Sequence, residues 1–600
     1  MKKYSIGIDL GTTNSVLAFV ELNVDEPQLQ ILRIPQVSAP NEIESRESLP
    51  SFLYLASEQE TESECFAIPT ASSARIVIGD YARRIAAEKP ERTVTAAKSW
   101  LCHGGVDRHS PILPWNSEQA DAKLSPVNAS KAILEQLVAT WDQEHPDFPI
   151  SDQRVTLTVP ASFDMAAREL TREAAIAAGL PSDFILLEEP QAAVYHWLDK
   201  VNEEWRNLVT KGDQILVCDV GGGTTDLTLV AVDEQTGDLE LKRQAVGNHL
   251  LVGGDNMDLA LAHLVAQKFA EKGTKLNPWQ SVSLWHSCRR AKEALLAEEG
   301  KECETISVLG RGSKLIGGTV SVEVDRQEIQ NFLIEGFLPI CNPDDQPMRE
   351  PNVGLQEIGL PFETDSAITR HIAAFLRNQK TSDSESESPK VHLLLNGGVF
   401  KAPALRARTR EAVAKLLGIQ ELPSVLGGPE DLDHAVAIGA AHYGWTKECG
   451  GIRIRAGAAR SYYVGIETSG LAIPGMPRPL QAVCVVPFGM EEGTEIEVPG
   501  KEVGLVVGRE ARFRFFAAPN RKEDQPGDAI REWTEEELVE TAPMEVSLST
   551  AEVPDEGFIP VKFCSKLSEL GVLELWCQST RSDEEWKLEL QVRDDAGAQA

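Results

Sequence analysis

The chain has 600 residues and a formal net charge of −34 at neutral pH. This length predicts several domains and a large buried core, whereas the acidic balance disfavours nucleic acid, because contacts to a phosphate backbone need a basic face. No apolar run approaches the roughly 20 residues that span a bilayer, so we expect a soluble, cytoplasmic protein without a membrane partner. The ten cysteines include no Cys-x-x-Cys pair, which favours reduced, buried thiols over zinc sites or disulfides.

The first predicted element is a hairpin over residues 4–20, in which two apolar arms flank a turn of small residues. The tip of this hairpin consists of Gly11, Thr12, Thr13 and Asn14. A glycine lets backbone N–H groups approach an anion, and hydroxyl groups add further donors, so the tip is typical of phosphate binding. Asp9 cannot hold phosphate itself and is a candidate for a magnesium ion or for the water shell of that ion.

The same design recurs in a second hairpin over residues 215–230, where Asp219 takes the place of Asp9. The small polar residues at its tip are Gly221, Gly222, Gly223, Thr224, Thr225 and Asp226. Two hairpins of one design, a domain apart, predict two similar α/β lobes that close on one polyphosphate from opposite sides. A third turn, Gly397-Gly398, follows a strand and precedes a helix, so its backbone N–H groups would again face outward.

Lys98 is the first charged residue of interest between the hairpins, because it lies among small residues in the segment 93–101. A strand of the buried type follows over residues 154–159 and ends at Pro160, ahead of a predicted helix over 165–178. A lone lysine is more often a surface residue. Its neighbourhood in this chain makes Lys98 a candidate for the phosphate site.

Two adjacent carboxylates, Glu188 and Glu189, follow the next predicted strand, which covers residues 184–187. A helix from residue 191 to about residue 201 comes after them. Carboxylates at the carboxyl end of a strand lie where ligands bind in α/β domains. A solvated loop is the alternative interpretation of this pair, and the local sequence does not decide between the two.

Helices are the main predicted elements after the second hairpin. A helix over 285–296 carries Arg289, Arg290 and Lys292, and two more helices are expected over 402–417 and 433–441. The acidic serine run at 382–388 has the composition of a loop.

The composition changes near residue 450, where glycines indicate a linker over residues 449–460. We expect one domain over 1–448 and a second over 461–600. In the second domain, apolar and polar residues alternate, for example over 511–516 and 586–592. Such alternation is typical of half-buried antiparallel strands and predicts a β-sandwich-like domain.

Together these residues resemble the DnaK-type heat-shock chaperone family over roughly residues 1–446. The segments that carry the resemblance, in family order, are Gly7–Ser15, Thr158–Phe163, Glu189-Pro190, Asp219–Asp226 and Ala435–Ala441. The resemblance implies an α/β, actin-like ATPase domain with two ribonuclease-H-like lobes, followed by a β-sandwich-like domain. It also implies ATP and Mg²⁺ as cofactors.

The resemblance assigns a role to each matching residue. Lys98 would offset negative charge on the transferred phosphoryl group and orient the attacking water, and Glu189 would position water or metal. The implied catalytic set is Lys98, Glu189, Asp219 and Thr224. The implied nucleotide-binding set is Gly11, Thr12, Thr13, Asn14, Gly221, Gly222, Gly223, Asp226, Lys292, Gly397, Gly398 and Lys401. Asp9 and Asp219 would act on the metal through water, and Pro160 and Arg168 would relay the nucleotide state to the other domain.

Four features depart from the family pattern. Arg289 replaces a glutamate on the helix that holds the ribose, and Lys401 replaces the arginine that stacks on adenine. Lysine stacks less well than arginine, so adenine affinity is expected to differ from that of the family. We also find no Leu-rich acidic linker, and the predicted strands continue almost to residue 600 without a helical lid.

The leading hypothesis is an ATP-dependent, chaperone-like protein whose β-domain binds polypeptide clients, with a co-chaperone or nucleotide exchange factor as further partner classes. The alternative is a nucleotide-gated module that binds one dedicated protein partner. A sugar kinase and a filament-forming actin relative share the same superfold and stay as less favoured alternatives. Fold alone does not decide among these functions. The C-terminal sandwich and the proline-bounded relay argue against the kinase.

Overall fold

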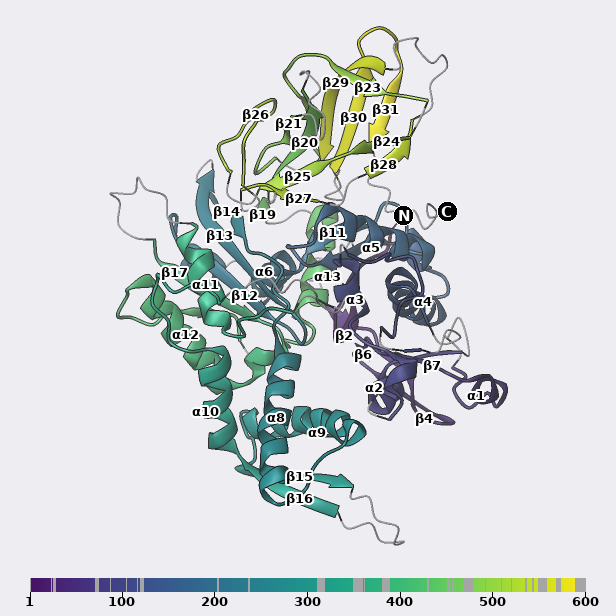
Figure 1. The fold of residues 1–600 in the computed structure, drawn as a ribbon, viewed down its shortest axis with the longest axis vertical. Coiled ribbons are helices and arrows are strands. Elements are labelled where there is room, and N and C mark those ends of the chain that lie inside the picture. Colours follow the sequence, from purple (N-terminus) through teal and green to yellow (C-terminus); the bar gives the residue numbers. More distant parts are fainter. Residues whose placement is uncertain are drawn as a thin grey trace.

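The computed structural model places residues 2–449 in two lobes and residues 460–588 in a separate domain of strands (Figure 1). The structure describes residues 2–588 except 23, 25–27, 69, 71–74, 87, 104, 116, 119–122, 202–203, 236–237, 310–318, 349–359, 361, 380–388, 429–430, 450–453, 456–457, 459, 469–478, 491–492, 509, 519–520, 535–536, 542–543, 549–557 and 568–572. The acidic serine run at 382–388 and most of the linker 449–460 lie outside the described residues.

The first lobe is built on a sheet with the strand order β11-β10-β1-β2-β3. The bounds of these strands are Tyr4–Leu10 (β1), Asn14–Glu21 (β2), Gln30–Ile31 (β3), Arg154–Val159 (β10) and Ile185–Glu188 (β11). Strand β1 pairs in parallel with β10 and antiparallel with β2. Helices α4 (Pro126–Glu144) and α5 (Met165–Ala177) share a hydrophobic core with this sheet, to which Trp141 contributes a fully buried ring.

The second lobe repeats this topology with the order β18-β17-β12-β13-β14-β19. The bounds are Gln214–Val220 (β12), Thr225–Gln235 (β13), Asp238–Val246 (β14), Val391–Asn396 (β17), Val425–Leu426 (β18) and Ile454–Arg455 (β19). Here β12 pairs in parallel with β17 and antiparallel with β13. The two predicted hairpins therefore occupy equivalent positions in two equivalent sheets, as the repeated motif predicted.

Two helices, α6 (Glu189–Val201) and α13 (Ala435–Cys449), pack against each other at the centre of the two-lobed part (Figure 1). Small residues allow this close packing. A Cβ at Gly439 would overlap the carbonyl oxygen of Ala192 on α6, and a Cβ at Gly7 on β1 would overlap the backbone of α13 at Ala437. Helix α13 thus joins the first sheet to α6 through backbone-to-backbone contact.

Smaller elements extend each lobe. In the first lobe they are β4 (Ile34–Ala39), β5 (Glu42–Arg46), β6 (Leu49–Pro50), β7 (Leu53–Leu55), α1 (Glu58–Glu62), β8 (Ile76–Ile78), α2 (Asp80–Ile85), β9 (Thr93–Val94) and α3 (Ala97–Leu101). In the second lobe they are α7 (Trp205–Leu208), α8 (Gly254–Glu271), α9 (Pro278–Leu296), β15 (Cys303–Leu309), β16 (Thr319–Asp325), α10 (Arg326–Phe337), α11 (Ile368–Arg377), the 3-10 turn η4 (Gly398–Lys401) and α12 (Pro403–Leu417).

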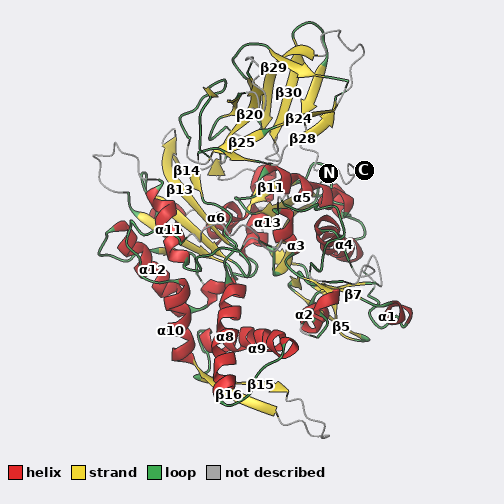
Figure 2. Cartoon of the chain, in the orientation of Figure 1, coloured by secondary structure: helices red, strands yellow, loops and turns green. Residues whose placement is uncertain are grey.

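The C-terminal domain consists of two main sheets with a two-stranded ribbon (Figure 2). The first sheet is β26-β21-β20-β25-β27, the second is β22-β29-β30-β31 with β23 paired to β29, and the ribbon is β24-β28. The bounds are Ser461–Glu467 (β20), Leu480–Val486 (β21), Glu495–Glu497 (β22), Val503–Val506 (β23), Glu510–Phe513 (β24), Phe515–Ala518 (β25), Ala529–Ile530 (β26), Val539–Glu540 (β27), Met544–Ser547 (β28), Phe558–Leu567 (β29), Leu573–Ser579 (β30) and Glu585–Leu588 (β31). Val485 and Phe515 of the first sheet share one core with Val561 and Leu575 of the second, so the two sheets form the predicted sandwich.

Several predicted boundaries were wrong, each for a local reason. The helix expected from residue 285 begins at Pro278, because Asn277 caps it and a proline at the first helical position is already preset for the helix. The strand expected over 511–516 breaks at Arg514 into β24 and β25, which belong to different sheets. The helix expected from residue 191 already begins at Glu189, and the helix expected over 433–441 runs over Ala435–Cys449.

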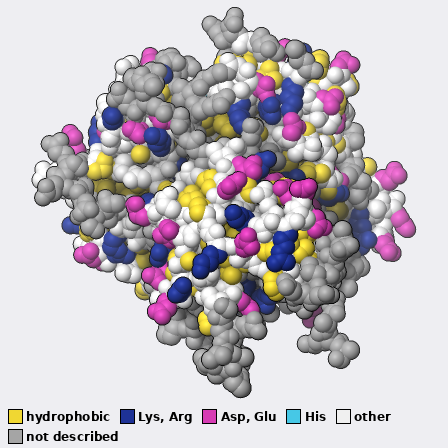
Figure 3. Space-filling model, turned by 90° about the horizontal axis from the view of Figure 1, so that it is seen from above, with side chains coloured by type: hydrophobic (Ala, Val, Ile, Leu, Met, Phe, Trp, Pro, Cys, Tyr) yellow, Lys and Arg dark blue, Asp and Glu magenta, His cyan; other side chains and the backbone are white. Residues whose placement is uncertain are grey.

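None of the helices that the structure describes has the length and apolar character needed to cross a membrane. On the face of the molecule seen in Figure 3, basic and acidic side chains are interspersed, and the coloured part of that face carries no continuous basic track.

Candidate active site between the two lobes

The loop of the first hairpin is shaped by contacts from behind. Ser51 donates its hydroxyl to the carbonyl oxygen of Gly11 (2.7 Å) and its backbone N–H to that of Thr13 (2.9 Å). Ser15 and Ser51 also hydrogen-bond through their hydroxyls (2.9 Å). The hydrogen bonds from Ser51 engage two carbonyl oxygens of the loop and so hold the loop backbone in place. Sequence reasoning missed Ser51. This residue lies 36 residues after Ser15 in the chain, and its hydroxyl group was the only indication of such a role.

The loop of the second hairpin is held by the start of α8. Gly254 and Asp255 donate their backbone N–H groups to the carbonyl oxygens of Gly221 (3.0 Å) and Gly222 (2.7 Å). Within the loop, the N–H of Gly221 donates to the carbonyl oxygen of Thr224 (2.9 Å). The N–H groups at the N-terminus of α8 are therefore bound to the loop and hold its tight turn in place.

The two hairpin loops meet across the space between the lobes. A Cβ at Gly222 would overlap the hydroxyl oxygen of Thr13, and a Cβ at Gly223 would stand 3.1 Å from Cγ2 of Thr12. Glycine is therefore required where the second loop approaches the first. The predicted arrangement, in which twin loops face one another, is what the geometry presents.

The third glycine turn closes against the end of β12. Gly397 has φ of 91°, a left-handed conformation that side chains disfavour, and a Cβ there would overlap the carbonyl oxygen of Val220. Asn396 donates its side-chain N–H to Oδ2 of Asp219 (2.8 Å). Gly398 opens the turn η4, which ends at Lys401. The turn therefore both adjoins the second hairpin and orients the Asp219 carboxylate.

A buried ion pair between Lys98 and Glu189 joins α3 to the first turn of α6. Ala96, just before α3, has φ of 53°, a left-handed conformation that is uncommon for alanine. Burial alone would lower the pKa of Lys98, but the charges of Glu189 and Asp9 outweigh it and raise that pKa. Lys98 is therefore firmly cationic.

The carboxylates around Lys98 have raised pKa values. Burial raises the pKa of Glu189 to about 8, against the opposing charge of Lys98. Burial likewise raises the pKa of Asp219 to about 7 and that of Asp9 above its ordinary value. The charges of Asp9, Asp219 and Asp226 each add to the rise at Glu189. Several carboxylates thus share one small region with the ammonium group of Lys98.

This donor set fits a divalent cation. Carboxylate oxygens and their bound waters are the ligands that Mg²⁺ prefers, and a positive charge close to Asp9 and Asp219 would favour their ionised forms against the burial that raises their pKa values. Thr158 donates its hydroxyl to Oδ1 of Asp9 (3.4 Å), which leaves the other oxygen of that carboxylate available.

Asp226 belongs to a second buried network. Ser162 donates its hydroxyl to Oδ1 of Asp226 (2.6 Å), and its oxygen lies 2.7 Å from Nδ1 of His249. His249 is also 3.5 Å from Oδ1 of Asp226. Ser162 and His249 were not predicted, since they stand 87 residues apart in the sequence and only the fold brings them to the second hairpin.

Of the two residues predicted to act as a relay, Arg168 is connected to the second lobe through one carboxylate. Pro160 follows β10, and Arg168 on α5 donates to the carbonyl oxygen of Phe163 (3.1 Å) and to Oε1 of Glu188 (2.7 Å). Glu188 is also ion-paired with Arg243 on β14. Burial would raise the pKa of Glu188, but Arg243 and Arg168 outweigh it and hold that pKa below its ordinary value.

A β-bulge in the second sheet explains where Arg243 points. In the pairing of β13 with β14, Leu229 faces Ala245 and Val230 faces Arg243, so Gln244 is the extra residue. A bulge changes the direction of the side chains beside it and leaves the extra residue outside the ladder. Arg243 is thereby directed to Glu188 in the first lobe, a contact that no local pattern in the sequence predicts.

The residues expected at the base and ribose are engaged with protein partners. Arg289 on α9 is ion-paired with Asp255 and with Asp258 (2.8 Å), and Lys292 with Asp258 (2.7 Å). Lys401 is ion-paired with Asp433, and about half of its side chain is exposed. The cluster around Asp258 lies directly behind the second hairpin loop, because Asp255 is bonded to Gly222.

Two lobes of repeated topology with opposed glycine loops, followed by a β-sandwich, define an actin-like two-lobed protein with an appended β-domain. The family model described as Hsp70 protein matches residues 69–359. The chain thus matches the Hsp70 family model over just under half of its length and is similar to the HscA and DnaK chaperones. The family resemblance read from the sequence is thus confirmed.

Three relatives illustrate the extent of this similarity. The chain is 28% identical over 458 residues to a chaperone protein HscA homolog of Pseudomonas aeruginosa, which covers 73% of this chain and 57% of that protein. It is 28% identical over 453 residues to an HscA homolog of Acidithiobacillus ferrooxidans, with 71% and 62% covered. It is 30% identical over 271 residues to the chaperone protein DnaK of Thermotoga petrophila, with 45% and 37% covered. The chain therefore spans less than two thirds of the length of each of these relatives.

Proposed function

We propose that the chain is an ATP-dependent, chaperone-like ATPase that binds and hydrolyses Mg·ATP between the lobes and couples the nucleotide state to polypeptide binding by the β-domain. The observation that carries this proposal is the meeting of the two hairpin loops beside the buried Lys98–Glu189 pair. The names of the HscA and DnaK relatives support it.

The side chains around Lys98 supply the chemistry that hydrolysis needs. The ammonium group of Lys98 would offset the charge that develops on the transferred phosphoryl group. Glu189, with a pKa of about 8, can accept a proton from a water held beside that ammonium group or return one to it near neutral pH. When bound, Mg²⁺ would neutralise phosphate charge through a water shell ordered by Asp9 and Asp219. The backbone N–H groups of Gly11–Thr13 and of Gly222 and Gly223 would hold the phosphates.

Binding of Mg·ATP is expected to raise the melting temperature of the full chain. A ligand at a concentration 100 times its Kd stabilises the native state by about 2.7 kcal/mol. The shift should be reduced by EDTA and lost in Gly222→Val, because the larger side chain would occupy the space that Thr13 approaches. Unchanged melting at millimolar Mg·ATP would contradict the proposal at its first step.

The β-domain contacts the second lobe at the bulged residue described above. Lys522 donates from Nζ to the carbonyl oxygen of Gln244 (3.2 Å) and to the side chain of Gln379 (2.7 Å). Strand β19 from the segment between the domains also extends the second sheet by pairing with β14. Because Arg243 and Gln244 are neighbours on one bulge, a change at the Glu188–Arg243 pair has a short path to the β-domain.

Lys522→Gln is expected to weaken the dependence of polypeptide binding on nucleotide. The full chain should bind many apolar peptides of a peptide array, with an affinity that differs between ATP and ADP, and the variant should bind them with nearly equal affinity in both. Lys562→Gln is the matched control, because Lys562 is an exposed lysine on β29 of the other sheet. Capture of only a few peptides would instead favour the nucleotide-gated module with one dedicated partner.

A further inference from the structure

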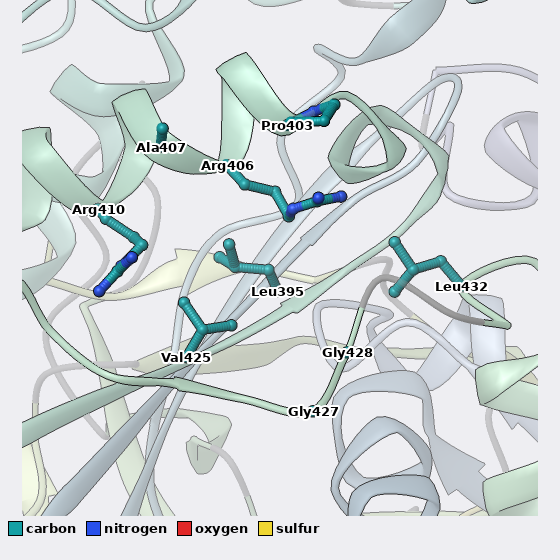
Figure 4. A pocket seen from close by; sticks show the side chains of 9 residues that line it. All are labelled: Leu395, Pro403, Arg406, Ala407, Arg410, Val425, Gly427, Gly428 and Leu432. Carbon is teal, nitrogen blue, oxygen red and sulfur yellow. The ribbon is translucent and has the colours of Figure 1, made fainter. Parts of the chain in front are cut away.

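A small cavity lies outside the cleft, between helix α12 and the edge of the second sheet. Its volume is about 270 Å³. The residues that line it are Leu395, Pro403, Arg406, Ala407, Arg410, Val425, Gly427, Gly428 and Leu432. Arg406 and Arg410 are one helical turn apart, and both side chains leave α12 on the side of β17 and β18 (Figure 4). The remaining lining is apolar or glycine.

The two guanidinium groups have no carboxylate partner within the described part of the chain. Arg406 donates from Nη1 to the carbonyl oxygens of Phe400 (2.6 Å) and Lys401 (3.2 Å), and Arg410 donates from Nε to that of Pro423 (3.0 Å). A guanidinium group presents five N–H donors. These backbone bonds orient both groups and leave Nη2 of Arg406 and both Nη atoms of Arg410 without a protein acceptor among the described residues.

Two carboxylates of the facing loop that the structure describes are engaged elsewhere. Asp431 is ion-paired with Lys200, and Asp433 with Lys401. Leu432, the residue between them, is the one that lines the cavity. The protein has a net charge of −34. Arg406 and Arg410 nevertheless face the cavity without a carboxylate partner in the described residues, and they create a local positive potential inside an otherwise apolar lining.

We propose that this cavity is a binding site for a small organic anion. A carboxylate or phosphate group would receive paired N–H donors from Arg406 and Arg410, the geometry in which arginine binds such groups best. The apolar part of the ligand would pack against Leu395, Val425 and Leu432. The volume of about 270 Å³ lies just below the range of roughly 300–1,000 Å³ for small-molecule sites, which suits a small metabolite.

Equilibrium dialysis of the full chain tests this site with two labelled probes, inorganic phosphate and succinate, at an ionic strength fixed with NaCl. We expect the wild type to bind at least one of them at a site whose affinity falls at least 10-fold in Arg410→Gln and in Arg406→Gln. Phosphate that binds between the hairpin loops would be common to wild type and variants, so the difference between them isolates the cavity. The two probes distinguish a phosphate ligand from a carboxylate ligand.

Arg408→Gln is the matched control, because Arg408 lies on the same helix and pairs with Glu335 and Glu411 instead of lining the cavity. Arg410→Lys, which keeps the charge but not the paired donors, should bind more weakly than wild type and guards against a folding defect in the glutamine variant. The proposal is overturned if all four variants bind both probes as the wild type does, or if Arg408→Gln loses as much affinity as Arg410→Gln.

Discussion

Lys98→Ala is expected to slow single-turnover hydrolysis of ATP by about 100- to 1,000-fold, the usual cost of removing one preorganised group that stabilises charge in the transition state. In the wild type, Lys98 is held cationic by Glu189 and Asp9 and is buried beside the hairpin loops. The variant removes this charge where negative charge would develop. Single-turnover measurement separates this chemical step from product release, which multiple-turnover rates would mix with it.

The controls for this experiment follow from the structure. Lys131→Ala removes a lysine from an ion pair with Glu135 on the surface of α4 and should leave the rate unchanged. The Lys98→Ala variant should still melt at a higher temperature with Mg·ATP, which shows that the site is folded. A variant that hydrolyses ATP as fast as the wild type would remove Lys98 from the mechanism.

The parts of the site that could be predicted are those that local sequence determines. Each hairpin combines apolar arms with a glycine turn inside a segment of fewer than 20 residues, so its geometry depends mainly on neighbours in the chain. The repeat of the motif then predicts a second lobe. The pairing of β1 with β10 and of β12 with β17, which joins distant segments in the same way in both lobes, was not predicted.

The parts that could not be predicted depend on contacts between distant segments. Glu188 was noted only as a neighbour of Glu189, with a solvated loop as the alternative, whereas the fold buries it between Arg168 and Arg243. The contact requires a bulge at Gln244, and the register of two strands is a property of the whole sheet.

The replacement of a family glutamate by Arg289 illustrates the same limit. On the sequence it indicated altered adenine affinity. In the fold, Arg289 is balanced by Asp255 and Asp258, and Lys401 is balanced by Asp433. Protein carboxylates therefore hold the cationic side chains that were expected near the base. The effect of Arg289 and Lys401 on nucleotide selectivity remains a prediction.

Arg243→Met is expected to lower the free energy of unfolding by about 3 kcal/mol, since removing one member of a buried ion pair leaves an incompletely compensated charge. The side chains of Glu188 and Arg243 are 6% and 5% exposed, so water cannot replace the lost partner. Arg168 remains bound to Glu188 and limits the loss. Urea unfolding of the full chain, monitored on its first-lobe tryptophans, measures the difference.

The double variant Glu188→Gln/Arg243→Met separates a charge effect from a packing effect. It should recover only part of the lost stability, because the neutral amide removes the charge that Arg243 balances but also the charge that pairs with Arg168, whose side chain is 12% exposed. The pH dependence has a defined sign. The two arginines hold the pKa of Glu188 below its ordinary value of 4.5, so the stability they provide is complete above that pH and is lost as the pH falls through the lowered pKa. The difference between wild type and Arg243→Met should therefore be constant from pH 6 to 8 and shrink below about pH 4.5. A difference that persisted at low pH would mean that Arg243 acts through packing instead of through its charge.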